Sequence, residues 1–94
     1  MNQWIRGTVS AEGDKIAGHN FKVVKPSQTT GAYTLIFLRD FEETPSVVAT
    51  INGDGWKIVD NAHVAKVDAG QCEIHTGDYY GALADRPFSF IAVG

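Results

Sequence analysis

The sequence has few of the features that mark several common classes of protein. It holds a single cysteine, Cys72, among 94 residues, so no disulfide can form within one chain. No apolar run approaches the roughly 18 residues that a membrane-spanning helix requires. The eight basic residues are spread along a chain of formal net charge -3, which leaves no basic stripe for a phosphate backbone. We therefore expect neither membrane insertion nor binding to nucleic acid.

Helical and export signals are also missing. No window of about 11 or more residues carries a clean helical stripe of apolar side chains. The first residues, Met1 to Arg6, lack the basic and then apolar regions of a secretory signal peptide. We therefore expect no export by that route from this chain, unless the chain was cut from a longer protein.

Glycine and proline punctuate short β-rich runs along the whole chain. Ten glycines and three prolines separate them, which is typical of an all-β sandwich or barrel. The length fits one domain, residues 1–94, because domains cluster at about 100 to 150 residues. We predict an antiparallel β-sandwich of six or seven strands, the seven being Trp4–Val9, Phe21–Lys25, Ala32–Leu38, Ser46–Asn52, Asn61–Val67, Gln71–Thr76 and Phe88–Val93.

The last strand, Phe88–Val93, is apolar on both faces. Every second residue from Phe88 is expected to line the core of the sandwich. The other face carries Ser89, Ile91 and Val93, and a neighbouring subunit is the expected cover. A small sandwich with more apolar surface than one core can use favours association with other copies of the chain.

Two histidines fall on the strands of one predicted hairpin. Its turn is centred near Ala69, so His63 and His75 are equidistant from it and would pair directly, with Cβ atoms about 5 Å apart. Such a pair can bind a metal ion or titrate together near neutral pH. A slip of one residue would place the two side chains on opposite faces. We favour structural histidines over a metal site, predict no cofactor, and count both histidines among the candidate ligand-binding residues.

The segment from Thr76 to Gly81 is the strongest candidate for binding a ligand. Tyr79 and Tyr80 offer flat apolar faces with hydroxyl tips, which suit the stacking of a sugar ring. Asp78 could accept hydrogen bonds from vicinal hydroxyls. The alternative is that both tyrosines pack against a neighbouring subunit. Trp56, after a glycine-rich turn, either caps the core or presents its indole to a ligand.

Catalytic chemistry is scarce. No short signature brings together a nucleophile, a base and an oxyanion site, and the three histidines lack the spacing of a zinc site. Cys72 lies in a predicted strand, where a small buried hydrophobe is the ordinary interpretation. We therefore expect that this protein is not an enzyme.

Two motifs give the chain a resemblance to known modules. Residues 37–48 have the form F-x-x-x-F-x-x-x-P-x-V-V, and residues 83–94 the form L-A-D-x-x-F-S-F-I-A-V-G. Together with Gly31 to Phe37 they resemble the small C-terminal β-sandwich modules of phage tail fibres and of bacterial surface or collagen-like proteins. The chain is also similar to H-type lectins, six-stranded sandwiches that form trimers, and a C1q-like jelly roll is a further form of the same class. The resemblance covers about residues 21–94.

The resemblance implies a function but does not carry over the lectin sugar site. That family holds its sugar by an aromatic–histidine pair after the penultimate strand and by a basic residue on the strand before. Here the loop positions read Asp78 and Tyr79, and the strand position falls near His63. We expect a trimeric recognition module for cell-surface glycan, on a phage virion or a cell surface as part of a larger fibre. The alternative is a structural trimerisation or capping domain without a ligand.

Overall fold

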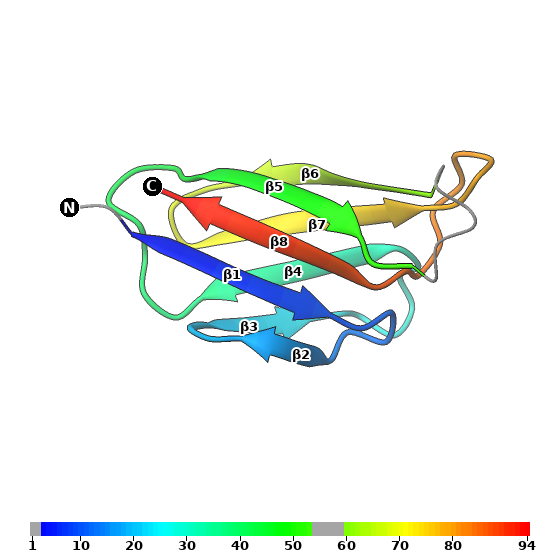
Figure 1. Ribbon diagram of the computed structural model, residues 1–94, viewed down its shortest axis with the longest axis horizontal. Coiled ribbons are helices and arrows are strands. Elements are labelled where there is room, and N and C mark those ends of the chain that lie inside the picture. Colours follow the sequence, from blue (N-terminus) through cyan, green and yellow to red (C-terminus); the bar gives the residue numbers. More distant parts are fainter. Residues whose placement is uncertain (1–2, 54–59) are drawn as a thin grey trace.

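Eight short β-strands form in the part of the chain that the structure describes, and in most of them alternate side chains face the core. The computed structural model describes residues 3–53 and 60–94, and within them the chain forms no helix. The strands are β1 (Trp4–Val9), β2 (Lys15–Gly18), β3 (Phe21–Val24), β4 (Ala32–Phe37), β5 (Ser46–Ile51), β6 (Asn61–Val67), β7 (Gln71–Gly77) and β8 (Phe88–Val93). They form two antiparallel sheets, sheet A in the order β2-β1-β8-β5 and sheet B in the order β3-β4-β7-β6 (Figure 1). The predicted sandwich is confirmed.

The sequence prediction missed one strand, β2. It has only four residues, and both Lys15 and Ile16 are exposed, so it lacks the alternation that marks a half-buried strand. It forms because the turn after β1 folds the chain back, with Asp14 N–H donating to Ser10 Oγ at 3.0 Å. A bulge between Thr8 and Val9 shifts the register of the β1–β2 pair. The strand is defined by its pairing with β1 rather than by its own side chains.

The core fills the space between the two sheets. Its largest members are aromatic, and the Phe21 and Phe90 rings meet edge to face with centroids 5.0 Å apart. Gly7 faces inward beside them, and a Cβ at this position would overlap the Phe21 ring. A glycine is therefore required here because two aromatic rings occupy the space of its side chain.

The terminal strand, β8, buries the face that its alternation predicted would line the core. β8 runs between β1 and β5, and its inward residues, Phe88, Phe90 and Ala92, are buried. On the other face, Ile91 is 44% exposed and Val93 is 49% exposed in the single chain. β1 pairs with β8 along its whole length, so the N-terminal strand belongs to the same sandwich.

Different segments lie at the two ends of the sandwich. Gln3 and Gly94 exchange two backbone hydrogen bonds of 2.8 and 2.9 Å at one end, where Phe41 closes the core beside Phe37. The loop between β7 and β8 projects from the other end of the long axis (Figure 1). A ligand at that loop would therefore lie at the end of the sandwich opposite the start of β1 and the C-terminus (Figure 1).

Candidate functional site

The loop from Asp78 to Pro87 begins with a tight turn built by Asp78. Its carboxylate Oδ1 accepts hydrogen bonds from the backbone N–H groups of Tyr80 and Ala82, at 2.9 and 3.0 Å. Its backbone carbonyl accepts from Gly81 N–H, and its N–H donates to the Ala82 carbonyl. Asp78 is therefore first of all the residue that shapes the turn, through one of its two carboxylate oxygens.

This turn presents two tyrosine rings to solvent. Tyr79 is 58% exposed and Tyr80 is 87% exposed, and their ring centroids lie 5.0 Å apart at an interplanar angle of 70°. Leu83, on the returning arm of the loop, is also exposed. Leu83 was not among the predicted binding residues, although its place as an apolar residue between two alanines was an available signal. The two rings make an aromatic tip at the end of the sandwich, whereas Leu83 lies at the base of the loop, where it pairs with Gly77.

The base of the loop is fixed to sheet B. The Thr76 hydroxyl donates to the Ala84 carbonyl at 2.6 Å, and Thr76 is buried. Gly31 has a φ of +71°, and a Cβ there would lie 2.6 Å from the Thr76 carbonyl oxygen and 2.9 Å from Ala84 N. Only glycine fits this position without strain. The tip is thus carried on a rigid base.

Charged groups at the base pair with one another. The Asp85 carboxylate accepts from Gly31 N–H at 2.7 Å and lies 3.1 Å from the Lys25 ammonium. These contacts, first the Gly31 hydrogen bond and then Lys25, lower the pKa of Asp85. Lys25 also lies over the Tyr33 ring, 5.3 Å from its centroid. Burial and then Asp85 raise the pKa of Tyr33, so its phenol stays neutral and can donate to a carbonyl.

A second ion pair joins the end of the loop to the start of β6. Arg86 Nε donates to Asp60 Oδ2 at 2.8 Å, and this bond raises the pKa of Arg86. Among the described residues at this end of the sandwich, Lys25 and Arg86 are therefore both engaged by carboxylates. The described surface near the tyrosines offers no cation held ready for an anionic ligand.

The two histidines form a separate cluster on the outer face of sheet B. His63 and His75 are direct cross-strand partners, with ring centroids 5.5 Å apart, as the hairpin arithmetic predicted. Glu73, two residues along the same strand, has Oε2 2.5 Å from His75 Nε2. Of the residues predicted to bind a ligand, the loop thus groups Asp78, Tyr79 and Tyr80, whereas sheet B groups the histidines. Trp56 lies outside the described residues.

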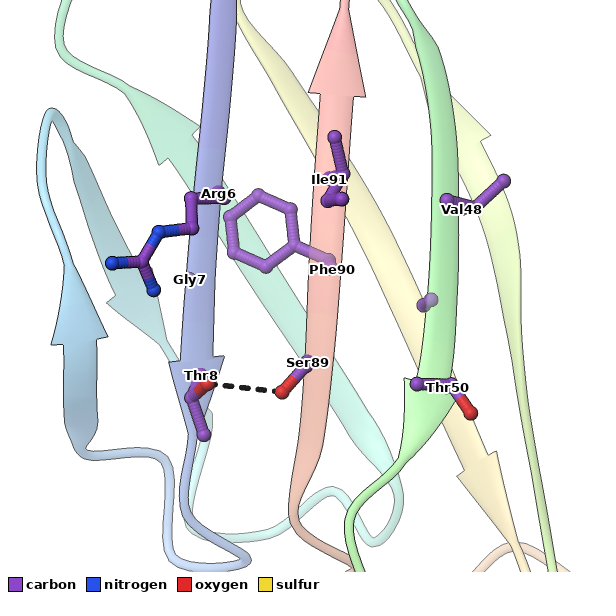
Figure 2. A pocket seen from close by; sticks show the side chains of 9 residues that line it. Arg6, Gly7, Thr8, Val48, Thr50, Ser89, Phe90 and Ile91 are labelled. Atoms are coloured by element: carbon purple, nitrogen blue, oxygen red, sulfur yellow. Dashed lines mark hydrogen bonds between the residues drawn. The ribbon is translucent and has the colours of Figure 1, made fainter.

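The outer face of sheet A is the third distinctive surface. Its outward positions on β1, β8 and β5 hold one charged residue, Arg6, and are otherwise apolar or hydroxylated: Trp4, Thr8, Ser46, Val48, Thr50, Ser89, Ile91 and Val93. A hollow of about 280 Å³ opens there between Arg6, Val48 and Ile91 (Figure 2). Thr8 and Ser89 share a 2.9 Å hydrogen bond along its floor.

Only part of this face was predicted from the sequence. Ile91 and Val93 of the terminal strand were expected there, but Trp4 and Val48, which are 63% and 66% exposed, were not. The available signal was the alternation in all three strands, which places Trp4 and Val48 on the faces opposite the core. Joining them required the strand order, in which β8 separates β1 from β5.

The described residues hold little reactive chemistry. Burial, and then the nearby Asp68, raises the pKa of the Cys72 thiol to about 12. Across residues 3–53 and 60–94, no three metal-ligating side chains gather closely enough to hold an ion. The same ranges contain no helix long and apolar enough to cross a membrane.

Fold and surfaces together define a small all-β sandwich of two four-stranded sheets, with an aromatic loop tip at one end and an apolar outer face on sheet A. No protein-family model, curated protein or solved structure matches the chain.

Proposed function

We propose that this protein is a non-enzymatic recognition module that binds cell-surface glycan through the tip formed by Tyr79 and Tyr80. The observation that carries the proposal is the exposure of both rings on a turn whose base is tied to the sandwich by the hydrogen bond from the Thr76 hydroxyl to the Ala84 carbonyl. Exposed aromatics that need little ordering on binding suit the apolar face of a sugar ring. The second oxygen of Asp78 remains for a ligand hydroxyl.

The charge around the tip favours a neutral glycan over an anionic one. Lys25 and Arg86 are paired with Asp85 and Asp60 in the described structure, so capturing a carboxylate-bearing sugar would require breaking an existing ion pair. Breaking one of these contacts would offset part of the new attraction. We therefore expect neutral hexoses and N-acetylhexosamines to bind better than sialylated or sulfated glycans.

We further propose that the module works as a homotrimer, at the end of a fibre on a phage virion or a cell surface. The outer face of sheet A supports association, because its outward positions carry one charge and several exposed apolar side chains. Three copies would turn a weak glycan site into an avid one. A shaft joined at the end of the sandwich where β1 begins would leave the β7–β8 loop facing away from it (Figure 1).

The resemblance to H-type lectins and to tail-fibre modules supports the trimer and the recognition role, but it does not supply the residues of the site. The structural alternative is a trimerisation or capping domain that binds no ligand. The apolar face of sheet A favours this alternative as strongly as it favours the recognition module, since both need a trimer. The two functions differ only at the tyrosine tip.

A glycan array of neutral and sialylated structures tests the recognition role. We expect the wild type to bind a set of neutral glycans, and Tyr79→Ala or Tyr80→Ala to weaken binding about tenfold, equivalent to 1.4 kcal/mol at an interface hot spot. Leu38→Ala is the matched control, because it truncates an exposed apolar residue at the other end of the sandwich. A wild-type trimer that binds no glycan would favour the structural alternative.

A further inference from the structure

The outer face of sheet B places two imidazoles where one ion could contact both. His63 and His75 are paired directly in the β6–β7 ladder, so their side chains leave neighbouring strands on the same side of the sheet. Their ring centroids lie 5.5 Å apart at an interplanar angle of 64°. The register of this hairpin decides whether the two rings share a face of the sheet. Because His63 and His75 pair directly, both rings lie on the same face.

A carboxylate already orients one of the two rings. Glu73 Oε2 lies 2.5 Å from His75 Nε2, and both side chains are partly buried on the sheet. Histidines that ligate metals commonly give their other ring nitrogen to a carboxylate, which fixes the tautomer and makes the ligating nitrogen more basic. In this arrangement Nε2 of His75 carries the proton toward Glu73, and Nδ1 is the nitrogen left for an ion.

We propose that His63 and His75 form a surface site for a divalent transition-metal ion such as Zn²⁺ or Ni²⁺. Imidazole nitrogen is a favoured ligand for these ions, with zinc–nitrogen bonds of about 2.0–2.1 Å. Tetrahedral geometry then separates the two nitrogens by roughly 3.4 Å, which small side-chain rotations reach from rings 5.5 Å apart. Glu73 positions His75 and does not itself ligate.

Water completes the coordination, because the described residues supply no third ligating side chain at this place. The site is therefore an open, exchangeable one rather than a closed structural centre. The site joins β6 to β7. Strand β6 lies at the edge of sheet B and pairs with no other strand of that sheet. A bound ion would thus stabilise the folded hairpin in proportion to its concentration. This inference does not depend on glycan binding at the tyrosine tip.

Isothermal titration of the full chain with ZnCl₂, and then with NiCl₂, tests the site. We expect one ion per chain, a melting temperature that rises with metal concentration, and loss of both effects in His63→Ala and in His75→Ala. His19→Ala is the matched control, because His19 is exposed in the turn before β3, and it should bind like the wild type. MgCl₂, a hard cation that prefers oxygen ligands, should give no signal.

A third variant separates positioning from ligation. Glu73→Gln should weaken zinc binding by 10- to 100-fold without abolishing it, as expected for a residue that orients a ligand. Circular dichroism of each variant without metal would confirm that it folds, and a variant that does not fold is replaced by His63→Gln or His75→Gln. The proposal is wrong if the wild type binds zinc no better than the doubly substituted chain, or if His19→Ala removes the binding.

Discussion

The Asp85 carboxylate accepts a 2.7 Å hydrogen bond from the backbone N–H of Gly31, 54 residues earlier in the chain. The contact joins the β7–β8 loop to the start of β4. Gly31 is buried, so its N–H has to find a partner in the folded protein. The loop that carries the tyrosine tip is therefore held by a residue only six positions from Tyr79 and five from Tyr80.

The first prediction removes this contact. Asp85→Ala should lower the free energy of unfolding by about 1–2 kcal/mol, because a charge-assisted hydrogen bond to a buried N–H is lost. Asp85→Asn keeps an acceptor oxygen but not the attraction to Lys25, and it should cost less. Urea denaturation at pH 7 measures both. Equal stability of the wild type and Asp85→Ala would show that the loop base does not depend on Asp85.

The same contact gives a pH dependence of defined sign. The Gly31 hydrogen bond and Lys25 lower the pKa of Asp85 in the folded state. The stabilisation is therefore complete above the ordinary carboxyl pKa of about 3.9, and it is lost as the pH falls through the lower folded value. The stability difference between the wild type and Asp85→Ala should be constant from pH 7 to pH 5 and shrink below pH 4.

The third prediction concerns Gly7, where two phenylalanines occupy the space of a side chain. Gly7→Ala should destabilise the protein by about 1–3 kcal/mol, because the added methyl group overlaps Phe21 and approaches Phe90 Cε1 to 2.9 Å. Thermal and urea unfolding measure the loss. The cost should fall in a Phe21→Leu background, which makes room for the methyl group. A neutral or stabilising Gly7→Ala would mean that the core adapts freely.

Local alternation was enough to predict most of the fold, and its limits are physical. The residues of β8 that face the core follow from the two-residue period of a strand. The pairing of His63 with His75 follows from the short turn between their strands. Strand β2 was not predicted, because its four residues bury little surface and show no alternation of apolar and polar side chains. The structural role of Asp85 was not predicted either, because its partner, Gly31, is distant in sequence. No local pattern connects a loop carboxylate to a backbone N–H so far away along the chain.

Cys72 supplies the fourth prediction. Burial raises the pKa of its thiol to about 12, so the folded protein keeps it protonated and shielded from thiol reagents. The unfolded thiol ionises near its ordinary pKa of about 8.5, so stability should decline as the pH rises between these two values, by up to about 1.4 kcal/mol per pH unit. Cys72→Ala should lack this contribution. Rapid labelling of the native protein by a thiol reagent at pH 8 would contradict the expectation.

The last prediction separates association from folding on the face that the terminal strand shares with β1 and β5. Ile91→Asp should convert the proposed trimer to a monomer, because the carboxylate, even beside its cross-strand neighbour Arg6, would have to lose its water in an otherwise apolar contact between subunits. The monomer should stay folded, since Ile91 is 44% exposed in the single chain. Val24→Asp is the matched control: Val24 is 43% exposed but lies on the outer face of sheet B, so this variant should remain a trimer. Light scattering gives the mass of each species, and circular dichroism reports its fold. If the wild type is already a monomer at micromolar concentration, the apolar face of sheet A does not join copies of this chain, and the avidity argument for weak glycan sites no longer applies.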